Sequence, residues 1–178
     1  GEVLEKNGDS RSTGTLKTMK ARHIIETEQW ETYELTDSLN GDELLALGLS
    51  AANLGDLLLA QSVTDRLKAL SSQSPNSTSL KLISMEVEAL TKFKQGQEDE
   101  AISMIMNAVS TAENQSPPRG AASPLKPVHE LAGDMLLQIG NHEKAAELYE
   151  ASLGRMANRP RALLGAARSY AGLDDNQN

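Results

Sequence analysis

The chain has 178 residues, no cysteine and a formal net charge of −8 at pH 7. This length suits one compact domain or a short array of repeats. Without cysteine the chain can form no disulfide, thiolate metal site or cysteine nucleophile, and it contains no run of roughly 18 apolar residues that could span a membrane. The acidic balance argues against nucleic-acid binding, which needs clustered Lys and Arg to contact phosphates.

The first part of the chain predicts a polar lead-in followed by one degenerate helix pair. Residues 1–13 are polar, and we expect them to be flexible. Ala21, Ile24 and Ile25 over residues 14–36 have helical spacing, and Glu28 follows them where a turn would lie. We expect a second, short helix to begin at Trp30. Because the chain starts with glycine instead of methionine, we also expect it to be a fragment of a longer protein.

The rest of the chain favours helices, because Leu and Ala together number 47 against 11 for Val and Ile. Three stretches repeat a pattern of helix, glycine turn and helix: residues 42–73 around Gly55, 77–115 around Gly96, and 126–157 around Gly140. All six prolines lie between these units, where they interrupt no helix. A final helix is predicted over 159–173. The insertion at 116–125 is interpreted as a surface loop in preference to a flexible flap.

The turn residues fit this pattern of antiparallel helix pairs. Gly55 and Gly140 can adopt the left-handed conformation that ends a helix. Asp56 and Asn141 follow them, and each can cap the next helix through its side-chain oxygen.

The unit around Gly140 resembles a tetratricopeptide repeat, a helix–turn–helix of about 34 residues. Small residues occupy the positions where helices of such a repeat approach closely: Gly133, Ala145 and Ser152. Large residues fill the gaps at Leu136 and Tyr149. The same phase gives small residues in the earlier units: Gly48, Ala60, Ala89, Ala101 and Ala108. The resemblance implies an all-α fold, a single α-solenoid over residues 14–175 with about seven or eight helices in a right-handed superhelix.

Residues 126–173 are also similar to a module at the C-terminal end of a group of bacterial tetratricopeptide proteins of unassigned role. The segment Pro127–Leu137 carries this similarity, and Glu147–Leu153 and Asn158–Arg168 continue it. The resemblance implies a soluble protein of the bacterial cytoplasm or periplasm.

In tetratricopeptide arrays the first helix of each repeat lines a concave groove in which peptides dock. The resemblance therefore implies a non-catalytic interaction or scaffold module that binds a protein or peptide partner and needs no cofactor. Carrying the groove positions over by phase gives the candidate partner-binding residues: Glu86, Leu90, Phe93, Lys94, Glu130, Asp134, Gln138 and Arg168, with Leu45, Leu49, Asn53, Leu137 and Leu164 beside them. Phe93 is either a groove anchor or a core residue, and the core is favoured.

The alternative hypothesis is an accessory part of a larger enzyme or metal-linked protein that uses His129 and His142. These histidines lie on paired helices, and Glu130 or Glu143 could complete a metal site. His129 and Glu130 begin an HExxH pattern, but Gly133 stands where its second histidine belongs. No phosphate loop, nucleophile elbow or dinucleotide fingerprint occurs in the chain. We therefore expect no enzyme and no bound metal, and a packing role for His129.

Charge is distributed unevenly along the chain. Residues 26–43 contain seven acidic residues and no Lys or Arg, whereas residues 151–173 contain four arginines and no acidic residue. One interpretation is electrostatic complementarity with a partner or head-to-tail contact between copies. The other is that these are solvated helix faces that keep the protein soluble.

The final helix carries an apolar stripe formed by Ala162, Leu163, Ala166, Ala167 and Tyr170. The last helix of a repeat array normally has a polar outer face. Either the parent protein continues beyond this helix, or the stripe packs against a second subunit. We predict a homodimer through the C-terminal helix.

Overall fold

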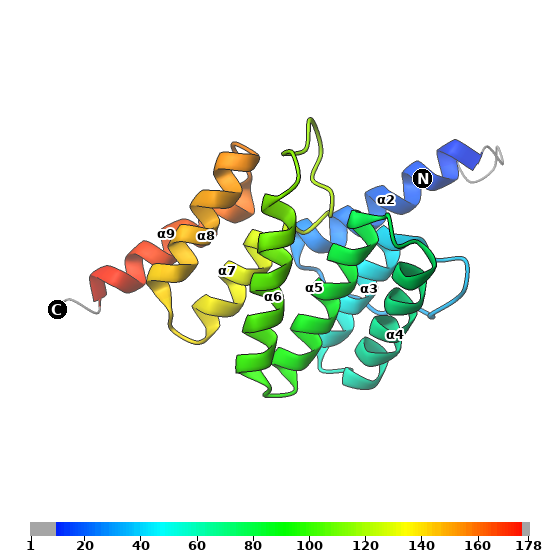
Figure 1. Ribbon diagram of the computed structural model, residues 1–178, viewed down its shortest axis with the longest axis horizontal. Helices are drawn as coiled ribbons and strands as arrows, with labels where there is room; N and C mark the ends of the chain where they lie inside the picture. The colour runs from blue at the N-terminus through cyan, green and yellow to red at the C-terminus, as the bar shows by residue number, and fades with distance from the viewer. Residues whose placement is uncertain (1–9, 176–178) are drawn as a thin grey trace.

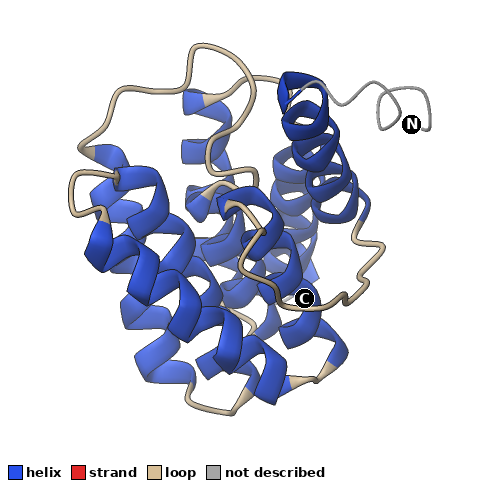
Figure 2. Ribbon diagram, turned by 90° about the vertical axis from the view of Figure 1, so that its right-hand side faces the viewer, coloured by secondary structure: helices blue, strands red, loops and turns tan. Residues whose placement is uncertain are grey.

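The computed structural model describes residues 10–175, which fold into eight helices in a row (Figure 1). This part of the chain contains no strand, which confirms the all-α prediction (Figure 2). The helices are α2 (Ser10–Thr27), α3 (Gly41–Leu54), α4 (Leu57–Gln73), α5 (Thr78–Lys94), α6 (Glu98–Glu113), α7 (Val128–Gln138), α8 (His142–Arg155) and α9 (Pro160–Asp175). Among these described residues, no helix is both long enough and apolar enough to cross a membrane.

Each helix packs against its neighbour in the chain, and the middle six helices form three hairpins (Figure 1). These hairpins are α3 with α4, α5 with α6, and α7 with α8. The first helices of successive hairpins also touch, α3 with α5 and α5 with α7. This stacking is the arrangement of a helical solenoid, and α2 and α9 lie at its two ends (Figure 1).

The hairpin turns have the chemistry that the sequence predicts. Gly55 ends α3 with φ of 82°, and Gly140 ends the α7 segment with φ of 78°, a left-handed conformation that most other residues adopt only at a cost in free energy. Asp56 Oδ1 then accepts a hydrogen bond from the backbone N–H of Leu59 at 3.1 Å. Asn141 Oδ1 accepts one from the N–H of Lys144 at 3.2 Å. These two hydrogen bonds confirm both predicted caps. Each cap satisfies a backbone N–H group that has no partner within its helix.

The N-terminal unit differs from the prediction. The predicted short helix at Trp30 is wrong, because residues 14–36 contain only the C-terminal part of α2, and residues 28–40 form no helix. Glu28 has φ of 54°, which ends α2. The segment after it follows the surface of the array, where Tyr33 OH donates a 2.5 Å hydrogen bond to the Glu43 carbonyl. The predicted flexible lead-in over 1–13 is wrong for residues 10–13, which belong to α2, and its residues 1–9 lie outside the described part of the chain.

Close packing in the C-terminal half depends on one aromatic residue between two glycines. Tyr149 of α8 is buried, with 1% of its surface exposed. A Cβ atom added to Gly133 of α7 would lie 2.8 Å from the Tyr149 ring, and one added to Gly165 of α9 would meet the same ring. The ring therefore occupies space that these two helices leave open only because they carry no side chain there.

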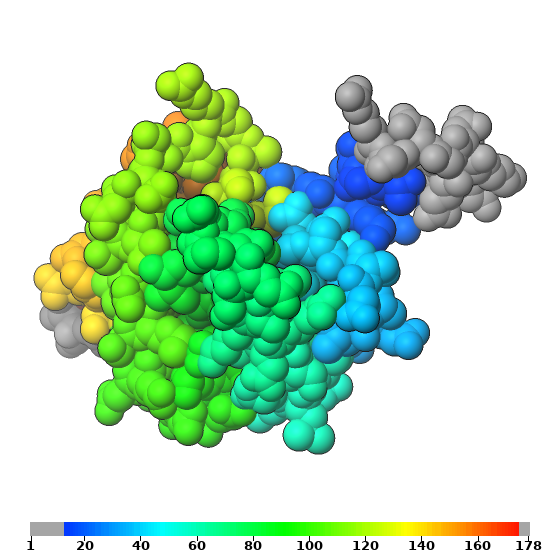
Figure 3. Space-filling view, turned by 45° about the vertical axis from the view of Figure 1, so that its right-hand side comes forward, coloured from blue at the N-terminus to red at the C-terminus, as the bar shows by residue number. Residues whose placement is uncertain are grey.

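The α6–α7 loop is only partly the surface loop that the sequence predicts. Its first half, residues 116–121, is largely exposed and projects from the continuous surface formed by α4, α5 and α6 (Figure 3). Its second half turns inward, where Ala122, Pro124 and Leu125 are buried. This burial carries the next residue, Lys126, into the interior, where only 4% of its surface is exposed. Apolar residues in the loop account for the difference, since they gain by leaving water.

The apolar stripe predicted on the last helix is divided between two faces. Ala162 and Ala166 are buried. Leu163 and Tyr170 point outward and are 51% and 46% exposed, and Tyr170 OH donates a hydrogen bond to Glu150. Two of the five residues of the stripe are therefore covered within the chain itself, and Ala167 is exposed like Leu163 and Tyr170. The predicted homodimer through α9 stays a prediction.

Candidate functional site

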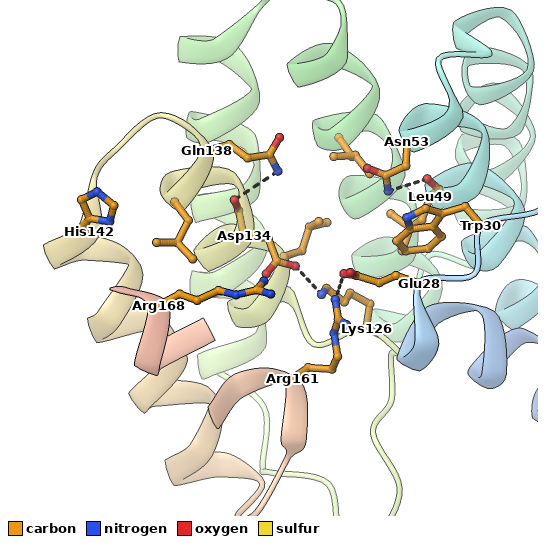
Figure 4. A pocket seen from close by; sticks show the side chains of 13 residues that line it. Glu28, Trp30, Leu49, Asn53, Lys126, Asp134, Gln138, His142, Arg161 and Arg168 are labelled. Carbon is orange, nitrogen blue, oxygen red and sulfur yellow. Dashed lines mark hydrogen bonds and ion pairs between the residues drawn. The ribbon is translucent and has the colours of Figure 1, made fainter. Parts of the chain in front are cut away.

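A pocket of about 460 Å³ lies on the inner side of the array (Figure 4). α3, α5, α7 and α9 supply most of its walls, and the start of α8 and the segments after α2 and before α7 complete it. The residues that line it are Glu28, Trp30, Leu49, Asn53, Leu90, Lys126, Leu131, Asp134, Leu137, Gln138, His142, Arg161 and Arg168. Its volume lies in the range of pockets that enclose small ligands. We call this space the central pocket.

Several predicted groove residues come together in the central pocket. Four of the candidate partner-binding residues line it, and so do three of the positions beside them: Leu90, Asp134, Gln138 and Arg168, then Leu49, Asn53 and Leu137. Lys94 stands at the edge of this group, where its Nζ donates a 3.3 Å hydrogen bond to Gln138 Oε1. The groove positions predicted from the repeat pattern therefore include seven of the residues that line the central pocket.

Three other candidates belong to the protein interior: the groove assignment of Glu86 and Glu130 is corrected, and the core alternative favoured for Phe93 is confirmed. Glu86 and Glu130 have no exposed surface, and Phe93 is 9% exposed and packs in the hydrophobic core. The neighbouring helices and the inward half of the α6–α7 loop cover them. Leu45, which the same phase placed in the groove, is fully buried as well, and Leu164 is exposed but does not line the central pocket.

Sequence reasoning missed four charged or aromatic residues that complete the pocket, Glu28, Trp30, Lys126 and Arg161, and it proposed His142 only as a metal ligand. Glu28, Trp30 and Lys126 lie outside the helices, and Arg161 lies on α9 at a position that the repeat phase does not select. Lys126 had one signal, since it is the only Lys or Arg between Gly120 and Gly140 and stands among apolar residues. The others had none, because their place depends on how the two ends of the array meet.

An ionic network around Asp134 forms part of the pocket wall. Lys126 Nζ contacts Asp134 Oδ2 at 2.5 Å, and Tyr149 OH donates to Asp134 Oδ1 at 2.6 Å. Burial by itself would lower the pKa of Lys126, but the carboxylates of Asp134, Glu130 and Glu86 outweigh it and raise this pKa. Burial also raises the pKa of Tyr149, and the Asp134 carboxylate adds to the shift. Lys126 is therefore charged and Tyr149 neutral at physiological pH.

A second part of the network joins the two ends of the array. Arg159, which directly precedes α9, contacts both oxygens of Glu130, with Nη2 3.1 Å from Oε2. The same Nη2 is 2.9 Å from Glu26 Oε1 at the end of α2. Arg161 forms an ion pair with Glu28. Hydrogen bonds and ion pairs outweigh the effect of burial and raise the pKa of Arg159.

These contacts answer the question raised by the uneven charge. Glu26 and Glu28 of the acidic stretch pair with Arg159 and Arg161 of the arginine-rich end, so two of the seven acidic residues and two of the four arginines are neutralised by each other. Another arginine of that end, Arg155, donates to the backbone carbonyls of Ala112 and Gln115 at 2.9 and 3.0 Å. Neither interpretation of the sequence included a contact between the two ends of one chain.

Glu86 is the one buried carboxyl whose oxygens both lack a hydrogen-bond partner within the described part of the chain. Burial raises its pKa well above the ordinary value of 4.5; the positive charge of Lys126 opposes this shift, and the negative charge of Glu130 adds to it. The carboxyl therefore keeps its proton in the folded protein at a pH where an exposed glutamate is ionised.

Glu86→Gln is expected to make the free energy of unfolding less dependent on pH. Wild-type Glu86 is protonated in the folded state and ionises near pH 4.5 once unfolded. The folded state thus binds more protons, and this group lowers the stability by up to about 1.4 kcal/mol per pH unit as the pH rises from 4.5 through the raised pKa. Glutamine does not ionise and removes this loss. Urea denaturation from pH 4.5 to 8 measures it.

The matched control is Glu88→Gln, which changes the same type of side chain on the same helix. Glu88 is partly exposed and forms a 2.7 Å ion pair with Lys68. We expect the Glu88→Gln protein to keep the wild-type pH dependence in this range. Parallel curves for wild type and Glu86→Gln would mean that Glu86 is already ionised in the folded protein.

The structure separates the two histidines of the metal hypothesis. His129 lies at the start of α7, whereas His142 begins α8 and so lies next to the other end of α7. About nine residues of α7 therefore separate the two histidines, or about 14 Å along the helix axis. His142 lines the central pocket, whereas His129 lines a smaller pocket of about 200 Å³ beneath the α6–α7 loop. Burial and Arg155 lower the pKa of His129, although Glu113 opposes the shift. No group of three His, Asp or Glu side chains within residues 10–175 is placed to hold a metal ion.

The chain was compared with known proteins in three ways. No protein-family model, no curated protein and no solved structure matches it.

Proposed function

We propose that the protein is a non-catalytic interaction module, a tetratricopeptide-like solenoid that binds a short segment of a partner protein in the central pocket. The observation that carries this proposal is the convergence of seven predicted groove positions, from four helices, on one pocket. Its apolar wall offers burial to side chains of a ligand, and its polar residues offer hydrogen bonds that orient it. As the resemblance implies, we place the protein in the bacterial cytoplasm or periplasm.

The size of the pocket favours an extended segment over a helix. Three turns of an α-helix with its side chains occupy roughly 1,300 Å³, since the helix is about 10 Å wide and rises about 5.4 Å per turn. The central pocket offers about 460 Å³. A few residues in an extended conformation can be enclosed in this volume, whereas a docked helix would place only one of its faces there.

Selection from a library of random ten-residue peptides tests this function. We expect the protein to enrich peptides that bind it, and we expect Asn53→Trp to weaken their binding at least about tenfold, because the larger side chain fills a pocket that the ligand must enter. Asn53 stands on the pocket wall and its own side chain bonds only within α3, to the Leu49 carbonyl at 2.9 Å. Isothermal titration calorimetry measures the Kd values.

Asn107→Trp is the matched control, because it makes the same substitution on an exposed position of α6 away from the central pocket. This variant is expected to bind the selected peptides as the wild type does. The proposal is contradicted if no peptide is enriched over an unrelated helical protein. It is also contradicted if Asn53→Trp, folded as judged by its melting curve, binds them unchanged.

A further inference from the structure

The central pocket contains more positive than negative side chains. Three cations, Lys126, Arg161 and Arg168, share it with the carboxylates of Glu28 and Asp134. Lys126 is paired with Asp134, and Arg161 with Glu28 (Figure 4). Arg168 makes no hydrogen bond or ion pair with any residue of the described part of the chain, so one positive charge of the pocket is left without a partner.

The position of Arg168 suits contact with a ligand. Its side chain reaches from α9 toward the middle of the pocket, where Asp134 already has Lys126 and Tyr149 as partners (Figure 4). Arg161 lies close enough for the two guanidinium groups to repel each other. Burial lowers the pKa of Arg161, and the charge of Arg168 lowers it further, against the effect of Glu26. An anion between the two arginines would relieve this repulsion.

The side of the pocket opposite Arg168 carries an aromatic residue beside the polar Asn53 and Glu28 (Figure 4). Trp30 stands there, on the segment that follows α2, and faces the arginines across the pocket (Figure 4). Leu49 lies next to Trp30 (Figure 4), and Leu90 and Leu137 add further apolar surface to the pocket lining. A ligand that fits both sides therefore carries an anionic group beside an apolar side chain. Burial of that apolar side chain and a charge-assisted bond to arginine are the two contributions that this geometry offers.

We propose that the segment bound in the central pocket is anchored by a single carboxylate that pairs with Arg168, beside an apolar side chain that packs on the Trp30 wall. This inference rests on the proposed function and names the chemistry of its ligand. A carboxylate matches the single unpaired charge. A phosphate carries a charge of about −1.5 to −2 at pH 7. Arg168 would balance one negative charge, and the carboxylates of Asp134 and Glu28 would repel the remaining negative charge. The carboxylate can belong to an Asp or Glu side chain or to a chain terminus, and the experiment distinguishes these two sources.

The test uses the ten-residue peptides enriched by the wild-type protein. We expect the peptides to share an acidic residue or a free C-terminal carboxylate. Changing the acidic residue to its amide, or amidating the terminus, is expected to weaken binding by about tenfold or more, which is typical of a lost hydrogen bond to a charged group. Whichever of the two changes has this effect identifies the source. Raising the NaCl concentration should weaken the acid peptide more than its amide.

Arg168→Gln ties this effect to one residue. The Arg168→Gln protein is expected to bind the acid peptide as weakly as the wild-type protein binds the amide peptide. Its affinity for the amide peptide should equal that of the wild type. Its melting temperature should be unchanged, because Arg168 makes no ion pair with the described residues that the substitution could remove. Arg119→Gln is the matched control, since Arg119 is exposed on the α6–α7 loop. Enriched peptides that carry no carboxylate, or that bind Arg168→Gln and wild type equally, would overturn the inference while the proposed function stands. The absence of any enriched peptide would overturn both.

Discussion

Arg159→Met is expected to lower the free energy of unfolding by about 3–5 kcal/mol, the typical cost of leaving a buried charge without its partner. Glu130 has no exposed surface, and both of its oxygens face Arg159. Its other side-chain contact is a 3.4 Å hydrogen bond from Ser152 Oγ, which cannot replace a guanidinium. The substitution also removes the contact with Glu26, which joins the two ends of the array. Urea denaturation at pH 7 measures the change.

Two further variants separate the buried charge from the loss of a surface pair. Arg159→Met combined with Glu130→Gln is expected to recover part of the lost stability, because no unpaired carboxylate then remains in the interior. Arg161→Met removes the pair with Glu28, whose side chain is 38% exposed, and is expected to cost less than about 1 kcal/mol. A loss below 1 kcal/mol for Arg159→Met itself would show that water or a rearranged side chain reaches Glu130.

Gly165→Ala is expected to lower the free energy of unfolding by about 1–3 kcal/mol, the usual cost of overfilling a packed interior. The new methyl group would overlap the ring of Tyr149, which cannot withdraw because Gly133 confines it on the other side. Relief requires α9 to move away from α8, and Arg168 stands less than one turn further along α9. We therefore expect weaker peptide binding together with the lost stability. Urea denaturation and calorimetric titration measure the two effects.

Gly154→Ala is the control for this substitution. Gly154 lies within α8, it is exposed, and a Cβ atom added to it would meet nothing within 4 Å. Alanine is expected to stabilise the helix there by up to about 1 kcal/mol, because glycine has more conformational freedom to lose on folding. Equal stability changes for Gly165→Ala and Gly154→Ala would contradict the proposed clash with Tyr149.

The sequence predicts this fold well wherever the decisive interactions are local. Gly55 with Asp56, and Gly140 with Asn141, specify a helix end and the next helix start within a few residues, and both turns form as expected. Where local preference gives way to packing, the prediction fails. A second helix was predicted to begin at Trp30, but the segment after α2 forms no helix, and its Tyr33 bonds to the Glu43 carbonyl of α3.

The candidate site was predictable in part for the same reason. Leu90, Asp134 and Gln138 lie on the first helices of their hairpins, so helical phase alone brings them to one surface. The spacing of residues along a helix predicts the side on which each residue lies. It does not predict which other parts of the chain pack over that side. Glu86 and Glu130 were therefore assigned to the groove, although neighbouring helices and the inward half of the α6–α7 loop enclose them.

The charge of the chain shows the same division most clearly. The sequence by itself determined that seven acidic residues lie near one end and four arginines near the other, and that the chain is a succession of helix pairs. Only the tertiary structure decided that Arg159 and Glu26, which are 133 residues apart, are partners. The small rotations between successive hairpins add up along the array, and no local pattern records their sum. Packing along the whole array brings the end of α2 to the start of α9, pairs most of the pocket's charges and leaves Arg168 without a partner within residues 10–175.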